Sequence, residues 1–254
     1  MTPSAVELPG GFLDRPFTHR ALHGPGRPEN SREAIAAAVA ASYGIEIDVQ
    51  LSRDAQAMVF HDYGLQRLMG INGTVQTKKQ QQLAATPLLG GRTGPPTLPE
   101  TLRMIDGRVP LVIEVKDQDG AMGPNVGVLE EQVAAALTAY AGPVAVMSFN
   151  PHSVAALADL APNVPRGITT CDFNAEDWPT VPATRRAELA PIPDFDRVGA
   201  SFISHDRKTL TDPAVAALKS RGIPVLTWTV KSQEQANVAR QIADQITFEG
   251  FTPA

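Results

Sequence analysis

The chain has 254 residues, of which 43% are hydrophobic and 19% charged, and its formal net charge at pH 7 is −5. This composition is typical of an ordered globular protein, and an acidic chain with scattered lysines and arginines lacks the clustered basic surface that nucleic acids require. The apolar stretch AIAAAVAA is too short to span a bilayer, and the N-terminus has no basic start followed by an apolar core, so we expect no membrane span and a cytoplasmic location.

Short β-rich runs alternate with alanine-rich helical runs along the chain. Strands are expected at 15–20, 44–50, 57–62, 109–117, 142–149, 165–170, 200–205, 223–230 and 244–250. Helices are expected at 30–42, 128–140, 150–160, 212–221 and 232–243, with Asn30, Asn150, Asp212 and Ser232 as their N-caps. Strands that alternate with helices indicate parallel βαβ units.

The number of strands favours a barrel. If 57–62 is the return arm of a hairpin, about eight parallel strands remain, which predicts an α/β fold of the (β/α)₈ or TIM barrel type. No linker divides the chain, so we expect a single domain over 1–254. An open doubly wound sheet is the structural alternative, although no G-x-G-x-x-G follows the first strand.

Two segments interrupt the alternation of strands and helices. Residues 63–99 are polar and rich in Gly, Gln and Pro, and we interpret them as an insertion at one end of the barrel, a lid or a specificity element. Residues 171–199 form a second long loop. The single cysteine, Cys171, excludes an intramolecular disulfide and is interpreted as an incidental thiol.

Two carboxylates lie within a strand that should be buried. Residues two apart in a strand face the same way, so Glu46 and Asp48 point together, while Ile45, Ile47 and Val49 occupy the other face. Burying carboxylates is costly unless positive charge compensates them.

Other strands carry charged or titratable residues toward their ends. These residues are Glu114 and Lys116 in VIEVK, His19 and Arg20 in FTHR, and His61 in VFHD. The carboxyl ends of barrel strands form the active-site face, so we expect all of them at one rim. Three carboxylates suit a hard divalent cation such as Mg²⁺ or Ca²⁺, the histidines can transfer protons, and Arg20 and Lys116 can hold an anion.

Simpler interpretations exist for each residue alone. A single acid could be half of an ion pair with Arg20 or Lys116, Arg20 could simply pair with Glu29, and a lone histidine is often structural. His205 could still line the pocket, whereas His152 is expected on a helix surface. The convergence of these residues on one rim favours a site for metal-assisted attack on a phosphate ester.

These motifs together resemble the glycerophosphodiester phosphodiesterase family. HRALHGPGRPENSREAI resembles the family's His-Arg-Gly and Pro-Glu-Asn-Thr opening, GIEIDVQLSRDAQAMVFHD its Glu-x-Asp strand and His-Asp, and LVIEVK its Glu-x-Lys strand. PPTLPETL, SFNP and LTWTV are similar to further elements, so the resemblance covers nearly the whole chain.

The resemblance implies a TIM barrel that hydrolyses glycerophosphodiesters to an alcohol and glycerol 3-phosphate. Glu46, Asp48 and Glu114 would bind one divalent cation, and His19 and His61 would be the general acid/base pair. Arg20 and Lys116 would neutralise the phosphate, and Glu29 would orient Arg20 or support other residues of the site. Trp228 would pack against the glycerol or the head group unless it is a plain core aromatic. The glycerol hydroxyl beside the phosphate would attack phosphorus, and water would open the resulting cyclic phosphate.

Two departures from the family pattern bear on the site. Ala21 replaces the glycine of His-Arg-Gly, and the last strand ends in ITFEGF, which puts Glu249 or Phe248 where the family has an aspartate. Two alternatives to the main function remain open, a lysophospholipase D that accepts lipid-tailed substrates and a catalytically silent barrel that binds a phosphate metabolite. The sequence does not indicate an oligomeric state.

Overall fold

The computed structural model describes residues 3–254, and their strands form a closed barrel. Eight parallel strands make up the barrel within these residues: β1 (Phe17–Thr18), β2 (Gly44–Leu51), β4 (Leu111–Val115), β5 (Val144–Ser148), β6 (Arg166–Thr170), β7 (Phe202–Asp206), β8 (Val225–Val230) and β9 (Gln245–Phe248). They follow one another in chain order around the barrel, and β1 closes it by pairing with both β2 and β9. β3 (Ala57–Val59) pairs antiparallel to β2, as expected for the hairpin arm. The TIM barrel prediction is confirmed.

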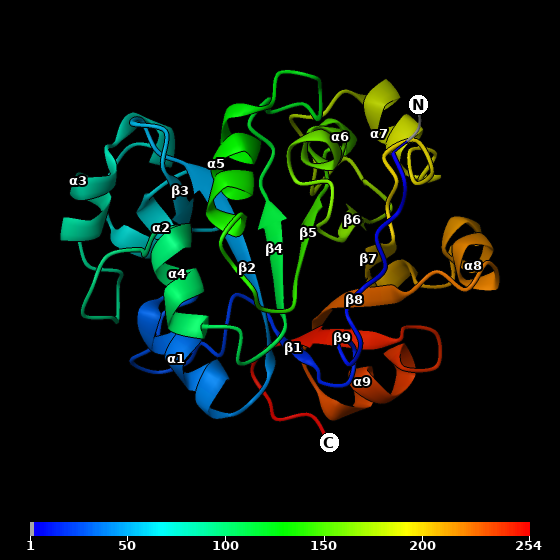
Figure 1. The fold of residues 1–254 in the computed structure, drawn as a ribbon, viewed down its shortest axis with the longest axis horizontal. Helices are drawn as coiled ribbons and strands as arrows, with labels where there is room; N and C mark the ends of the chain where they lie inside the picture. Colours follow the sequence, from blue (N-terminus) through cyan, green and yellow to red (C-terminus); the bar gives the residue numbers. More distant parts are fainter. Residues whose placement is uncertain (1–2) are drawn as a thin grey trace.

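Helices surround the strands (Figure 1). The five expected helices are present, somewhat shorter than predicted, as α1 (Arg32–Ala40), α5 (Val128–Leu137), α6 (Pro151–Leu160), α8 (Pro213–Ser220) and α9 (Gln233–Ala239). The prediction missed α2 (Gln66–Met69), α3 (Gln80–Ala85), α4 (Leu98–Ile105), α7 (Ala183–Leu189) and the 3₁₀ turns η1 (Val75–Thr77) and η2 (Arg207–Thr209). Among the described residues, no helix combines the length and the apolar character needed to cross a bilayer.

The helix caps are partly as predicted. The side chains of Asn150 and Ser232 accept hydrogen bonds from backbone N–H groups in the first turns of α6 and α9. Asp212 precedes α8 without a side-chain capping bond. Asn30 was the wrong cap for α1, because Ser31 accepts from the Ala34 N–H at 3.1 Å and the amide of Asn30 is used in the barrel instead.

The 63–99 segment is ordered around a small core of its own and lies beside β3 (Figure 1). Leu65, Leu68 and Leu83 pack there against Met58 and Phe60 from the hairpin arm. The polar composition of this segment concealed that core, although Leu65, Leu68 and Leu83 are buried in it while Leu89 remains exposed. A role as lid or specificity element, and the division of the chain into one domain with an insertion, stay predictions.

The side chains of β2 and β4 point alternately outward, toward the helices, and inward, into the barrel. Ile45, Ile47 and Val49 pack outward with the helices in the largest apolar cluster. Inside the barrel, Phe17, Val112 and other apolar residues form a separate cluster. Val112 precedes Glu114 by two residues on the same face, so this cluster closes the barrel below the carboxylates and leaves them at the carboxyl end.

Candidate active site

Three carboxylates meet inside the barrel, as the sequence predicted. Glu46 and Asp48 come from β2 and Glu114 from β4, where Asp48 and Glu114 are direct neighbours in the parallel register. One oxygen from each lies within 4.8 Å of the others, although these residues are only 3%, 1% and 7% exposed. A close cluster of carboxylate oxygens has the donor chemistry that Mg²⁺ and Ca²⁺ prefer.

Lys116 and Arg20 compensate part of this negative charge. The Lys116 ammonium lies 2.9 Å from Asp48 Oδ1 and 2.6 Å from Glu114 Oε1, and Arg20 Nε lies 3.6 Å from Asp48 Oδ2. Burial would raise the pKa of Asp48, but Lys116, His61 and Arg20 outweigh burial and hold this pKa well below its usual range. Asn30 adds a hydrogen bond from its Nδ2 to Asp48 Oδ2 at 2.9 Å.

Glu46 is the carboxylate whose negative charge is least compensated. Burial, followed by repulsion from Asp48 and Glu114, raises its pKa well above the ordinary value. Its Oε2 accepts a hydrogen bond from the Arg20 backbone N–H at 2.8 Å, which offsets only part of that cost. Three carboxylates beside two cationic side chains leave a deficit of positive charge, and this deficit fits a bound divalent cation.

A left-handed turn directs the backbone onto Glu46. Arg20 and Ala21 have φ angles of +52° and +63°, and the Ala21 N–H donates to the Glu46 carbonyl at 2.9 Å. Non-glycine residues in this region cost about 1–2 kcal/mol each, and such strain is often found at functional sites. Ala21 therefore has a positive φ, a backbone conformation that glycine adopts with less strain than alanine.

His19 is oriented by Glu249. His19 Nδ1 lies 2.6 Å from Glu249 Oε2, which also lies 3.4 Å from His23 Nε2, while Lys231 Nζ lies 2.7 Å from Glu249 Oε1. The hydrogen bond from His19 holds the pKa of Glu249 far below its usual value, so this carboxylate is ionised and Nδ1 of His19 carries the proton. The other nitrogen of His19, Nε2, is thereby left as the atom that can accept a proton.

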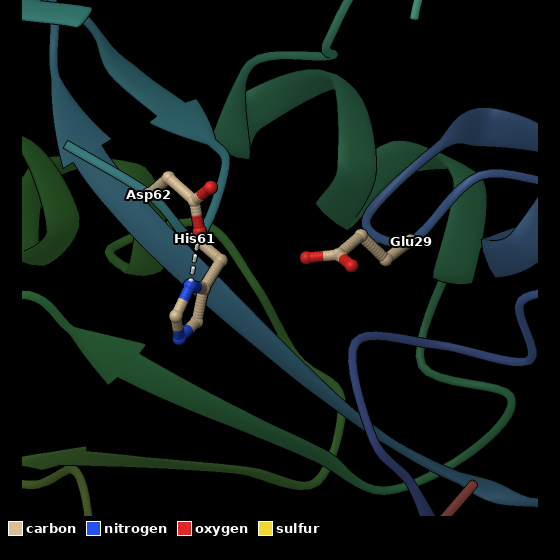
Figure 2. A group of neighbouring side chains, drawn as sticks. All are labelled: Glu29, His61 and Asp62. Atoms are coloured by element: carbon tan, nitrogen blue, oxygen red, sulfur yellow. Dashed lines mark hydrogen bonds and ion pairs between the residues drawn. The ribbon is translucent and has the colours of Figure 1, made fainter. Parts of the chain in front are cut away.

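His61 is oriented in the same way, by Asp62. His61 Nδ1 lies 2.7 Å from Asp62 Oδ1, and Figure 2 shows the second ring nitrogen on the side away from that carboxylate. Glu29 lies opposite, with its carboxylate directed toward the pair (Figure 2). Arg67 spans the gap with hydrogen bonds of 2.7–2.8 Å to both Asp62 and Glu29.

These contacts identify Glu29, His61 and Asp62 as an ion-pair network rather than a second metal site. Their ligand atoms are close enough to hold an ion, but the Arg67 guanidinium already supplies the positive charge. Glu29 also accepts from Arg20 Nη1 at 2.8 Å, as predicted. One chain of hydrogen bonds thus connects Arg20 to the His61–Asp62 pair.

All of the predicted site residues except Glu29 line one or both of two adjoining cavities. The inner cavity, about 90 Å³, is bordered by His19, Arg20, Glu46, Asp48, His61, Glu114, Lys116 and Trp228, among others. The outer cavity, about 630 Å³, shares His61, Glu114, Lys116, Phe149 and Trp228 with the inner one. Trp228 donates from Nε1 to the Ser204 carbonyl at 3.0 Å, so its ring has a fixed position between the two cavities.

The remaining titratable candidates have structural environments. His205 is fully buried, with Nδ1 2.7 Å from Thr170 Oγ1 and Nε2 2.9 Å from Thr209 Oγ1, so it does not reach the inner cavity. His152 lies in the first turn of α6, as expected. Burial raises the pKa of Cys171 to about 12, which keeps the thiol protonated and unsuited to nucleophilic attack.

The side chains that orient the site residues were not predicted from the sequence. Glu249 was noted only as a departure from the family pattern, and Asn30 only as a helix cap. Glu249 does follow β9 directly, so the rule that selected His19 and Lys116, a polar residue just after a barrel strand, could have found it.

Comparisons with known proteins agree with this geometry. The sequence profile of the "Glycerophosphoryl diester phosphodiesterase family" matches residues 19–246. YhdW of Bacillus subtilis (strain 168), named as a candidate glycerophosphodiester phosphodiesterase, is 26% identical over 230 residues, which are 87% of each chain. A glycerophosphodiester phosphodiesterase of Bacillus altitudinis is 29% identical over 166 residues, covering 61% of this chain and 66% of the relative.

Solved structures share the fold. The phosphodiesterase OLEI02445 of Oleispira antarctica, determined in complex with the product sn-glycerol-3-phosphate, superposes with a TM-score of 0.75 at 21% identity, over 95% of this chain and 93% of the other. A glycerophosphodiester phosphodiesterase of Thermotoga maritima gives a TM-score of 0.68 at 18% identity, over 91% and 92% of the two chains. Because the profile match spans most of the sequence, the chain belongs to the glycerophosphoryl diester phosphodiesterase family of enzymes.

Proposed function

We propose that this enzyme hydrolyses glycerophosphodiesters to glycerol 3-phosphate and an alcohol, with one divalent cation, Mg²⁺ or Ca²⁺, held by Glu46, Asp48 and Glu114. The observation that carries the proposal is the inner cavity, which is lined by the carboxylate cluster and by the two histidines, each paired with a carboxylate at its Nδ1. The sn-glycerol-3-phosphate bound to the Oleispira antarctica enzyme supports the same product here.

The contacts of the residues support a role for each of them. Arg20 and Lys116 would hold the phosphate oxygens and offset the charge that builds up on them in the transition state. When bound, the cation would act as a Lewis acid toward the phosphate and the neighbouring hydroxyl. Glu29 would keep the Arg20 guanidinium in place through their 2.8 Å hydrogen bond.

The histidines would transfer protons at Nε2, because their Nδ1 atoms are engaged by Glu249 and Asp62. In the first step, one histidine takes the proton of the glycerol hydroxyl beside the phosphate as that oxygen attacks phosphorus. The other histidine protonates the departing head-group oxygen and leaves a cyclic phosphate. In the second step, water opens the ring with the two proton transfers reversed.

Release of glycerol 3-phosphate from glycerophosphocholine and glycerophosphoethanolamine is the direct test. With Mg²⁺ or Ca²⁺ present, we expect turnover that a chelator abolishes and re-addition of metal restores. Chelator-resistant turnover would contradict the metal assignment. Bound metal without any release would favour the silent phosphate-binding barrel, and faster cleavage of lysophosphatidylcholine would favour the lysophospholipase D alternative. The cytoplasmic location remains a prediction from the sequence.

Glu249→Gln is expected to lower kcat about 10- to 100-fold, because the amide loses the charge that orients His19 and stabilises its protonated form. Burial lowers the pKa of His19, and the hydrogen bond and charge of Glu249 oppose that effect. Their removal lowers this pKa further, so the limb of the pH–rate profile that belongs to His19 should move to lower pH.

Two further variants control this measurement. Glu249→Asp, the residue type that the family resemblance leads one to expect there, should retain more activity than Glu249→Gln. Glu234→Gln, an exposed change on α9, should leave both the rate and the profile unchanged. An unaltered pH–rate profile in Glu249→Gln would show that Glu249 does not act through His19.

A further inference from the structure

The outer cavity is much larger than the inner one and has a wall of different chemistry. Its volume of about 630 Å³ lies between the loops that follow β3, β4, β5, β6 and β7, and it opens into the inner cavity beside Phe149 and Trp228. The inner cavity, at about 90 Å³, cannot hold the whole substrate. A phosphodiester whose phosphate lies between Arg20 and Lys116 must therefore extend one of its arms into the outer cavity.

Aromatic rings at different angles form one wall of the outer cavity. Phe149 is at the centre, with ring centroids 4.7 Å from Trp178 and 5.6 Å from Trp228. The interplanar angles are 58° and 84°, so the rings enclose a corner instead of stacking as parallel plates. Phe173 supports Trp178 from behind at 5.2 Å. Such a corner of π faces attracts cations, and quaternary ammonium groups in particular.

Carboxylates without a counter-ion lie around the rings. Asp172, Asp177 and Asp206 line the cavity, and none of them makes an ion pair within residues 3–254. One carboxylate oxygen of each aspartate accepts a hydrogen bond from a neutral N–H group. Asp172 and Asp177 accept from Asn174, and Asp206 accepts from the backbone N–H of Lys208. The second oxygen of each has no hydrogen-bond partner among the same residues.

The charge of this region is negative overall. Among the described residues, Lys208 is the only basic residue that lines the outer cavity but not the inner one. Its single positive charge can offset only one of the three aspartates. Asp172 and Asp206 also add to the burial that raises the pKa of Cys171, in agreement with a negative potential along that wall. An aromatic surface under a negative potential is complementary to a cation and unfavourable for an anion.

The arm that enters the outer cavity is the head group. In the proposed reaction the glycerol arm must stay beside the histidines through both steps, because its own hydroxyl attacks phosphorus. The alcohol, by contrast, departs between the steps and needs a route to solvent. The rim of the outer cavity, with exposed Asp172, Asp177 and Lys208, provides that route.

We infer that the outer cavity is a head-group subsite for cationic amines, with quaternary ammonium bound best, and that it selects choline-type glycerophosphodiesters over those with neutral polyol head groups. This inference rests on the proposed function, because the head group reaches the subsite when the phosphate occupies the inner cavity. Trp178 and Trp228 supply the aromatic faces, and Asp206 with its neighbours supplies the potential.

The first test compares kcat/KM for glycerophosphocholine and for glycerophosphoglycerol, whose head group is neutral. We expect a ratio of about 10 or more in the unaltered enzyme, since a cation–π contact and a partly exposed charge are each worth about 3- to 10-fold. Trp178→Leu and Asp206→Asn should each lower this ratio about 3- to 10-fold, and high salt should reduce the effect of Asp206→Asn. Asp159→Asn, an exposed change of the same type on α6, should not alter the ratio.

The second test measures binding without turnover. Both tryptophans of the chain line the outer cavity, so intrinsic fluorescence reports on its occupancy. Choline should give a saturable change in fluorescence, whereas 3,3-dimethylbutan-1-ol, its uncharged carbon analogue, should not. Trp178→Leu should weaken the choline response that remains from Trp228.

The outcomes separate the two proposals. Hydrolysis of both substrates with equal kcat/KM, or a ratio that neither variant changes, overturns the subsite and leaves the proposed function standing. Equal binding of choline and its uncharged analogue also overturns it, because the cavity would then be merely apolar. If no glycerophosphodiester is hydrolysed, the proposed function fails, and the choline titration alone decides whether the cavity is a cation site.

Discussion

Glu46→Gln is expected to abolish metal binding and turnover while raising the melting temperature of the metal-free protein. The amide keeps the size of Glu46 and can still accept the 2.8 Å hydrogen bond from the Arg20 N–H. It removes one of the three anionic ligands, so we expect kcat/KM to fall by at least about 10³-fold, which corresponds to about 4 kcal/mol.

Although Glu46→Gln should lower activity, it should raise the free energy of unfolding of the metal-free protein. Burial and the neighbouring carboxylates raise the pKa of Glu46 in the folded state above its unfolded value, so the folded state loses stability as the pH rises from the unfolded pKa through the raised one. Each tenfold difference in proton affinity is worth about 1.4 kcal/mol. Glutamine cannot ionise and avoids this cost at neutral pH.

Thermal melts with chelator and with metal check this prediction. The unaltered protein should gain about 2.7 kcal/mol of stability when the metal concentration is about 100 times its Kd, and Glu46→Gln should gain none. The matched control is Glu131→Gln, an exposed substitution on α5, which should behave like the unaltered protein. A Glu46→Gln protein that still binds metal would refute the assignment of Glu46 as a ligand. One that melts lower than the unaltered protein in chelator would refute the expected gain in stability.

His61→Ala is expected to lower kcat by about 10²- to 10⁴-fold and to leave metal binding intact. The imidazole is no part of the carboxylate cluster, since its Nδ1 pairs with Asp62, and its second nitrogen has no hydrogen-bond partner within residues 3–254. The measurements are kcat for glycerophosphocholine and the metal-dependent shift of the melting temperature. His152→Ala on α6 is the control for the loss of a histidine away from the cavities.

The two measurements distinguish a catalytic role from a structural one. If His61→Ala lost the metal-dependent shift together with activity, His61 would act by holding the Arg67, Glu29 and Asp62 network in place. Unchanged activity would remove His61 from the proton-transfer pair. Only a rate loss with metal binding retained supports the proposed role.

The sequence by itself determined the fold class and the elements that carry the site. Strands that alternate with helices imply parallel pairing, and the two-residue period of a strand sends Glu46 and Asp48 inward when Ile45, Ile47 and Val49 go outward. Both rules depend only on neighbours along the chain. They also predicted that His19, His61, Glu114 and Lys116 follow or end strands at a common rim.

The helices α2, α3 and α4, which lie in or at the end of a polar segment, were not predicted by these rules. α4 begins at a Thr-x-x-Glu sequence in which Thr97 caps the Glu100 N–H, a local signal that could have been used. The helices α2 and α3 have too few residues for a clear period, and they are stabilised by Met58 and Phe60 from the hairpin arm. Their formation therefore depends on packing between distant segments.

Only the tertiary structure decided how each site residue is held. Glu249 reaches His19 across 230 positions of sequence because β9 pairs with β1 to close the barrel. Asn30 bonds Asp48 rather than α1, and Arg67 connects Glu29 to Asp62 through a segment that looked like a polar insertion. The pKa values of these groups depend on burial and on charges brought close by folding, and neither quantity is encoded in the spacing of residues along a chain.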